Sequence, residues 1–204
     1  MQLGSIVLYA LVGTVAAVVL TACGSVKGNQ IVQVPKDGPT ARLRVITPST
    51  YGTNVNIRGY PGKDCIQGLE GGGNILNLAA VTTFIESRSG QTIGMPLSEK
   101  SGPQYKTTEI AVAGDKWFAL SLDGYWGGGK YVSGGYEYTI PVGRCARAVT
   151  FLPKAGEDYE VFFDGTGGSS CSVSGSRLVS AAPSAPRAEH IEALELTPTV
   201  SCNK

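Results

Sequence analysis

The stretch that decides the fold is residues 146–179, which read ARAVTFLPKAGEDYEVFFDGTGGSSCSVSGSRLV. Residues 146–152, 158–163 and 171–179 carry apolar side chains at every second position or are rich in β-forming residues, and short Gly- or Pro-containing turns separate them. Val149 and Phe151 share one face of the first segment, and Tyr159, Val161 and Phe163 share one face of the second. The pattern predicts three strands in an antiparallel meander with a buried inner face.

The same alternation continues upstream. The pattern predicts two pairs of strands, residues 41–46 with 54–60 and residues 107–113 with 116–125, and a further strand at residues 136–142. Residues 75–85 fit one or two strands or a short helix. The turn residues between the first pair predict a hairpin or near neighbours, and Gly114-Asp115 between the second pair predicts a hairpin turn.

These segments predict an all-β protein, an antiparallel β-sandwich of roughly seven to nine strands, immunoglobulin-like or transthyretin-like in outline. Arg42, Arg44 and Arg58 are expected on outward strand faces in contact with water, with an anion or lipid-headgroup site as the alternative.

An N-terminal signal helix is expected before the sandwich. Residues 6–20 form an apolar run of the length of a secretory signal, which is short for a membrane span of about 20 residues. The run closes on Leu20-Thr21-Ala22-Cys23, which resembles the lipobox of bacterial lipoproteins. The resemblance implies cleavage before Cys23, lipid on Cys23 and, because Asp does not follow the cysteine, anchoring to the periplasmic side of the outer membrane. No Lys or Arg precedes the apolar run, and an uncleaved anchor or a buried core helix remains an alternative.

A second resemblance lies in residues 95–180. The pattern is similar to the C-terminal half of small uncharacterised lipoproteins of proteobacteria, and it comprises Phe151-x-Pro153-x-x-Gly156-x-x-Tyr159-Glu160-Val161 followed by Cys171-Ser172-Val173. It implies a lipid-anchored β-domain without a known activity.

The chain therefore divides into a signal peptide (1–22), a tether (23–40), a β-sandwich domain (41–179) and a tail (180–204). The tail begins with a Pro/Ala linker, and its residues 188–196 are expected to form a short helix or a strand.

Five cysteines are present: Cys23, Cys65, Cys145, Cys171 and Cys202. With Cys23 lipidated, the other four predict two disulfides in an exported chain. Three pairings are possible. Next-but-one strands of a flat sheet lie too far apart for a bridge, but twist or a loop position brings Cys145 near Cys171. We favour Cys145–Cys171, which leaves Cys65–Cys202. A metal site is not expected, since no C-x-x-C spacing occurs and His190 is the only histidine.

Composition and motifs argue against an enzyme and against a nucleic-acid-binding protein. The net charge is +1, there is no Gly-x-Ser-x-Gly elbow, and His190 lies in a polar tail. Glu157, Asp158 and Glu160 are expected in water rather than paired in a catalytic site. No cofactor is expected.

The strongest binding candidate is the glycine-rich loop predicted for residues 126–135. Trp126 and Tyr131 lie in it, and Tyr125 and Tyr136 lie beside it. Their rings suit a protein partner or a sugar, or cover the end of the sandwich.

The sequence thus predicts a non-catalytic, lipid-anchored cell-envelope protein with a structural or partner-binding role. Its expected partners are the membrane, through Cys23, and an envelope protein or glycan. Two alternatives stay open: an inhibitor or immunity-type lipoprotein that blocks an envelope-directed hydrolase, and a glycan-binding module. An ordered, protruding segment at residues 124–135 would favour the inhibitor.

Overall fold

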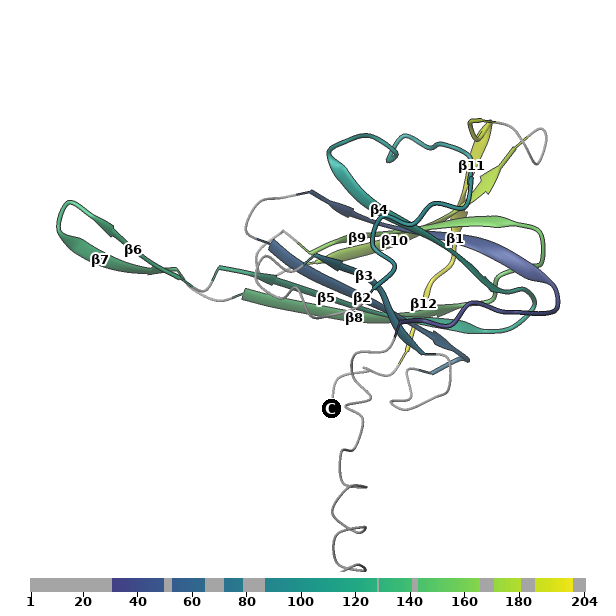
Figure 1. Ribbon diagram of the computed structural model, residues 1–204, viewed down its shortest axis with the longest axis horizontal. Coiled ribbons are helices and arrows are strands. Elements are labelled where there is room, and N and C mark those ends of the chain that lie inside the picture. Colours follow the sequence, from purple (N-terminus) through teal and green to yellow (C-terminus); the bar gives the residue numbers. More distant parts are fainter. Residues whose placement is uncertain are drawn as a thin grey trace, which may run out of the picture.

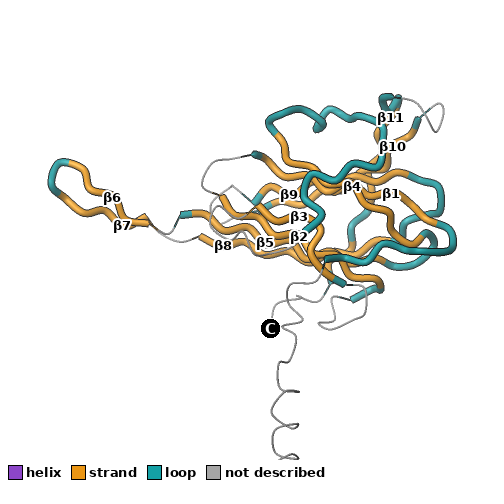
Figure 2. The backbone as a smooth tube through the Cα atoms, viewed as in Figure 1, coloured by secondary structure: helices purple, strands orange, loops and turns teal. Residues whose placement is uncertain are grey.

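Two five-stranded β-sheets pack face to face, and a two-stranded hairpin extends from one end of them (Figures 1 and 2). The computed structural model describes residues 31–49, 53–64, 72–78, 87–127, 129–140, 143–165, 171–180 and 186–199. The predicted all-β, antiparallel-rich sandwich is confirmed, and this described part contains no helix. Accordingly, no helix long and apolar enough to cross a membrane occurs in it. The expected signal helix lies outside it.

The first sheet has the strand order β11-β10-β9-β1-β4. Its members are β1 (Thr40–Pro48), β4 (Tyr105–Ala113), β9 (Asp158–Asp164), β10 (Ser172–Val179) and β11 (His190–Leu194). All neighbours are antiparallel except β1 and β9, which run parallel. We call it the β1 sheet.

The second sheet has the order β12-β8-β5-β2-β3 and is antiparallel throughout. Its members are β2 (Thr53–Pro61), β3 (Gly73–Leu78), β5 (Phe118–Trp126), β8 (Gly143–Phe151) and β12 (Thr197–Pro198). We call it the β5 sheet.

The core lies between the two sheets and is built from alternate residues of their strands. The fully buried members with large side chains include Leu43, Ile57, Leu120, Leu122, Phe151, Val161 and Phe163. These are the positions that period-two alternation assigns to inner faces, because successive side chains of a strand point to opposite sides of the sheet. The predicted inner faces of residues 146–163 are therefore confirmed.

The predicted connections are correct for one hairpin and wrong for three. β9 and β10 are hairpin neighbours, as expected. β1 and β2, β4 and β5, and β8 and β9 instead lie in opposite sheets. At the β4–β5 connection, the N–H groups of Gly114 and Asp115 donate to Pro39 and Pro153 carbonyl oxygens, 2.9 and 2.7 Å away, rather than closing a ladder. Alternation shows that a face is buried but not which sheet it belongs to.

The disulfide predicted between Cys145 and Cys171 is present, with the two Cα atoms 5.9 Å apart. Cys145 lies in β8 of the β5 sheet, and Cys171 directly precedes β10 of the β1 sheet. The bridge therefore crosses the core between the two sheets. The large separation of next-but-one strands within one sheet does not apply to it. Cys65 and Cys202 lie outside the described residues, so their pairing stays a prediction.

Both ends of the described chain join the sandwich. Val32, in the segment expected as a tether, is fully buried, and its N–H donates to the Asn74 carbonyl of β3 at 3.1 Å. In the tail, β11 pairs with β10, and β12 pairs with β8. The strand alternative for the tail is thus the one observed, and the tail borders both sheets on one side of the sandwich.

Removing the inter-sheet disulfide should destabilise the protein without changing its fold. The bridge closes a loop of 26 residues, so replacing Cys145 and Cys171 by Ala should lower the free energy of unfolding by about 3 kcal/mol through the greater entropy of the unfolded chain. Urea unfolding measures the difference, and a loss below about 1 kcal/mol would show that the bridge adds little to the packed core.

Candidate functional site

A segment without regular structure crosses the outer face of the β1 sheet from edge to edge. We call residues 91–101 the strap. At one edge, the N–H of Glu109 in β4 donates to the Gln91 carbonyl at 2.8 Å. At the other edge, beside β11, the N–H of Leu97 donates to the Pro186 carbonyl at 3.0 Å, and the N–H of Ala188 donates to the Leu97 carbonyl at 3.1 Å. The strap therefore covers the face that the sequence predicted to be in contact with water.

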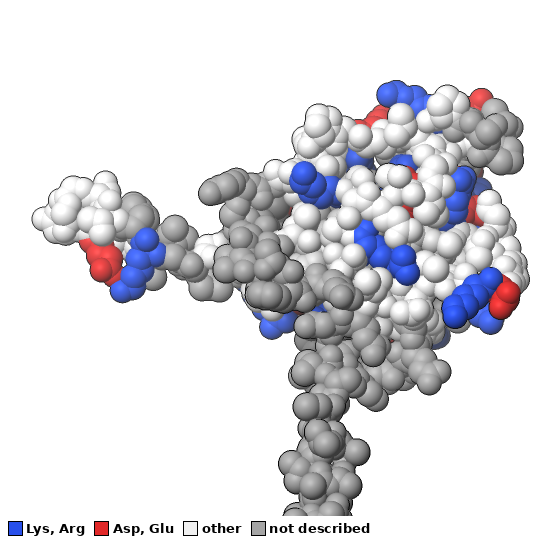
Figure 3. Space-filling model, in the orientation of Figure 1, with Lys and Arg blue, Asp and Glu red and all other residues white. Residues whose placement is uncertain are grey.

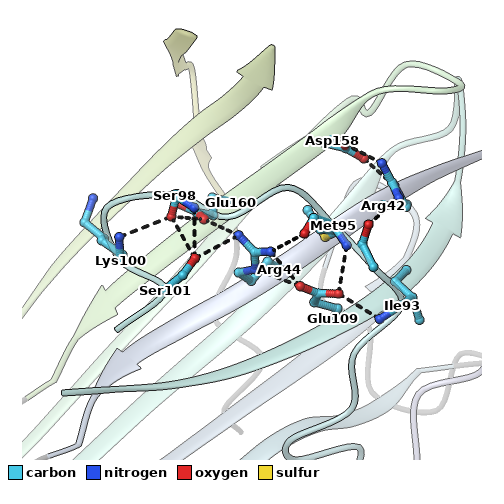
Figure 4. Close-up of polar contacts among 11 residues, drawn as sticks. Arg42, Arg44, Ile93, Met95, Ser98, Lys100, Ser101, Glu109, Asp158 and Glu160 are labelled. Carbon is cyan, nitrogen blue, oxygen red and sulfur yellow. Dashed lines mark hydrogen bonds and ion pairs between the residues drawn. The ribbon is translucent and has the colours of Figure 1, made fainter. Parts of the chain in front are cut away.

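Beneath the strap, one arginine lies between two glutamates on neighbouring strands (Figure 4). Arg44 of β1 stands directly opposite Glu109 of β4 and Glu160 of β9 in the strand register. Its guanidinium donates to Glu109 from Nη2 at 2.6 Å, to Glu160 from Nη1 at 2.8 Å and to the Met95 carbonyl from Nη2 at 3.1 Å. The side chains are almost fully enclosed, since Arg44, Glu109 and Glu160 are only 2%, 5% and 4% exposed.

The strap supplies hydrogen bonds to both carboxylates. The N–H groups of Ile93 and Met95 donate to Oε2 of Glu109 at 2.7 and 3.2 Å, and the Ser98 hydroxyl donates to Oε2 of Glu160 at 2.6 Å. Buried charges are tolerated when they are paired and hydrogen-bonded in this way. We call Arg44, Glu109 and Glu160, with these strap groups, the charge cluster.

A second ion pair beside the charge cluster holds the same segment. Arg42 donates to both carboxylate oxygens of Asp158, with Nε–Oδ1 at 2.6 Å and Nη2–Oδ2 at 2.7 Å, and its Nη1 donates to the Gly94 carbonyl at 3.0 Å. Two arginines of β1 thus bind carbonyl groups of the strap.

The expectation that these charged groups are solvated is wrong for Arg44, Asp158 and Glu160. Arg44 does point outward, as predicted, but the strap encloses it, and Asp158 and Glu160 are buried as well. The third carboxylate, Glu157, remains at the surface and binds Arg177 Nη1 at 2.7 Å. Sequence reasoning missed the charge cluster because the strap shows no periodic apolar pattern that would mark it as a cover.

The environment of Glu109 favours its ionised form. Burial by itself raises the pKa of its carboxyl group, but the hydrogen bonds from the Ile93 N–H, Arg44 and the Met95 N–H, together with the charge of Arg44, lower the pKa further than burial raises it. The net pKa lies below the usual value of 4.5. Glu109 therefore stays ionised and bound to Arg44 and to the amide groups of the strap.

The hairpin seen at one end of the sandwich is the second candidate site. It consists of β6 (Gly129–Ser133), β7 (Tyr136–Ile140) and the turn Gly134-Gly135, whose φ values of 60° and 79° fit a type I′ turn. We call residues 129–140 the arm. Its register continues that of β5 and β8, because Trp126 faces Gly143 and Gly129 faces Ile140. The arm is the outer part of one long ribbon whose inner part belongs to the β5 sheet (Figure 1).

The arm exposes large side chains and carries little charge. Val132 and Tyr136 are each 71% exposed, and Tyr138 is 44% exposed. Lys130 and Glu137 form an ion pair on the arm (Figure 3), and residues 129–140 contain no other charged residue in the sequence. The arm has no formal net charge, and it presents an apolar, aromatic surface of the kind that is enriched at protein interfaces.

The root of the arm is ordered by an aromatic–cation contact. The Arg144 guanidinium of β8 lies 5.0 Å from the Tyr125 ring of β5, and its Nη2 donates to Asp123 at 3.0 Å. Tyr125 is partly exposed where the ribbon leaves the sheet.

The structure brings the four predicted binding residues onto one ribbon. Tyr125 and Trp126 end β5, Tyr131 lies in β6 opposite Tyr138, and Tyr136 begins β7. The predicted glycine-rich loop at residues 126–135 is wrong, since residues 129–133 form a strand. The prediction missed Val132 and Tyr138, which the alternation on either side of Gly134-Gly135 could have revealed. Cys23 lies outside the described residues.

Comparisons with known proteins assign the chain to no family. No protein-family model matches the chain, and no curated protein matches its sequence. Within the described ranges, no three His, Cys, Asp or Glu side chains gather in a way that could hold a metal ion. The functional argument therefore rests on the charge cluster and the arm themselves.

Replacing Arg44 by Met should be strongly destabilising, because it leaves two buried carboxylates, one on each side of β1, without their shared cation. We expect a loss of about 3–5 kcal/mol in the free energy of unfolding, measured in urea. Arg58→Met is the matched control. Arg58 lies in the other sheet, is partly exposed and donates to Asn74 Oδ1 at 3.1 Å, so its loss should cost about 1–2 kcal/mol, less than the loss of Arg44. Equal effects of the two substitutions would contradict the assigned role of the charge cluster.

The charge cluster should also make stability dependent on acidity. A carboxyl group whose pKa is lower in the folded than in the unfolded state contributes stability above its unfolded pKa, and this contribution is lost as the pH falls through the folded pKa. Wild type should therefore lose more stability than Glu109→Gln between about pH 7 and about pH 3, because the amide cannot be protonated in this range. Urea titrations at both pH values test this, and identical losses would refute it.

Proposed function

We propose that this chain is a non-catalytic, lipid-anchored protein of the cell envelope that binds a partner protein through its arm. The resemblance of Leu20-Thr21-Ala22-Cys23 to a lipobox supports export, lipid on Cys23 and attachment to the periplasmic side of the outer membrane. The inter-sheet disulfide fits an oxidising compartment. The observation that carries the binding role is the extension of the arm beyond the sandwich, with Val132 and Tyr136 largely exposed.

The two candidate sites differ in what their side chains can offer a partner. In the charge cluster, Arg44, Glu109 and Glu160 bind one another and the strap, and they are buried. In the arm, Val132, Tyr136 and Tyr138 are presented to solvent. We therefore assign the charge cluster to stability and the arm to binding.

The physical cost of an exposed arm supports this assignment. A hairpin of two strands that packs on nothing is at best marginally stable in water, whereas three or more strands with an apolar face are stable. Exposed aromatic side chains on such a hairpin stabilise no core, but they bury large areas at an interface, where Tyr is a frequent hot spot. A binding role explains why these side chains occupy the arm.

A second candidate function, an inhibitor of an envelope-directed hydrolase, is favoured by the same geometry. A narrow two-stranded hairpin with a Gly-Gly tip can enter a cleft that a flat sheet surface cannot reach. This inhibitor is a special case of the proposed binding role, in which the partner is an enzyme.

The test is a crosslinked pull-down from envelope membranes with the full chain and with an arm-less variant, in which Asn-Gly replaces residues 127–142 between Trp126 and Gly143. That position continues the ribbon register, so the sandwich should fold unchanged. We expect protein partners with the wild type and a large loss of them with the arm-less variant. The control Leu152→Ser, at an exposed apolar residue outside the arm, should retain them. Recovery of glycan alone, or of the same proteins without the arm, would refute the proposal.

A further inference from the structure

Both strands of the arm have one unpaired edge. β6 and β7 pair with each other, and within the described part of the chain no third strand pairs with either. We infer that a second copy of this chain pairs with β7, so that two arms form one four-stranded antiparallel sheet around a two-fold axis. The inference rests on the proposed binding role of the arm and names its partner.

The register of the arm shows which backbone groups β7 offers. A type I′ turn closes with a hydrogen bond between the Ser133 carbonyl and the Tyr136 N–H, so Ser133 and Tyr136 form a hydrogen-bonded pair. Hydrogen-bonded and non-hydrogen-bonded pairs alternate along an antiparallel ladder. Glu137 and Thr139 are therefore non-hydrogen-bonded toward β6, and their N–H and carbonyl groups point to the free edge.

Only one register of two antiparallel β7 strands uses these groups well. With Tyr138 opposite Tyr138 of the second copy, each Glu137 faces a Thr139, and the two exchange hydrogen bonds. A register centred on Glu137 would place two carboxylates opposite each other, which is destabilising. A register centred on Thr139 would place Glu137 opposite Pro141, which has no N–H to donate.

The side chains favour β7 over β6 as the paired edge. In the Tyr138-centred register, two partly exposed tyrosines face each other across the axis, a type of pair that stabilises sheets. The equivalent pairing of β6 would place Ser133 opposite Gly129, which offers little side-chain contact.

The charge of the arm favours a second copy rather than a partner of opposite charge. Lys130 and Glu137 of each arm neutralise each other, so two arms do not repel, and neither attracts a strongly basic or acidic surface. The pairing also converts two marginal two-stranded ribbons into a four-stranded sheet.

The experiment introduces Tyr138→Cys into the full chain and oxidises isolated envelopes. In the inferred register the two Cα atoms at position 138 lie about 4.5 Å apart, which a disulfide can span. We expect a crosslinked species of twice the chain mass, in which peptide mapping finds the introduced cysteines of the two copies joined to each other. Val132→Cys, at an exposed position on β6 whose strand is not paired in the inferred register, is the control and should remain monomeric, as should the unsubstituted chain.

A backbone variant tests the same edge without a further cysteine. Thr139→Pro in the Tyr138→Cys chain removes the outward N–H and leaves the ladder to β6 intact, so it should lower the yield of the crosslinked dimer about tenfold. Crosslinking of the Tyr138→Cys chain to a different protein through position 138 would overturn the second copy as partner while supporting the proposed function. Monomer alone would overturn the inference. The proposed function would be overturned separately, by a pull-down that recovers glycan alone or recovers the same proteins without the arm.

Discussion

Glu160, Arg44 and Glu109 place alternating charges side by side on three neighbouring strands, and the strap buries all three. Each group makes the burial of the others tolerable, because a lone charge in such a site costs several kcal/mol. The strap in turn is ordered by the carboxylates that accept its N–H groups and by the arginines that bind its carbonyl groups. The cover of the β1 sheet therefore depends on this ionic arrangement rather than on an apolar outer layer.

Within the described residues, the β5 sheet has no such cover, but two of its strands lead into the arm. The pairing register of β5 with β8 is the same as that of β6 with β7. The arm therefore extends in the direction of β5 and β8, which are anchored in the core. The disulfide at Cys145 ties β8 to the opposite sheet two residues after that strand begins. The arm thus projects from a firmly held base, which suits a binding element that must be presented at a distance from the body of the protein.

Alternation in the sequence predicted the strands, the inner faces and the all-β class, because burial of one strand face is a local property. It did not predict which strands pair: Gly114-Asp115 reads as a hairpin turn, yet its amides bond to neighbouring loops. Arg44 reads as solvated because its cover lies about fifty residues away in an aperiodic segment. The tyrosines of the arm were found from their composition, but the strand pairing that presents them depends on the Gly134-Gly135 turn.

The central claim is that the arm is the binding element and that the strap is a permanent structural cover. Hydrogen–deuterium exchange of the full chain, compared between its native envelope and dilute detergent solution, tests this claim most directly. The account predicts that the amides of Glu137 and Thr139 exchange more slowly in the envelope, whereas those of Ile93 and Met95 are equally protected in both. Unchanged exchange in the arm together with altered exchange in the strap would contradict it.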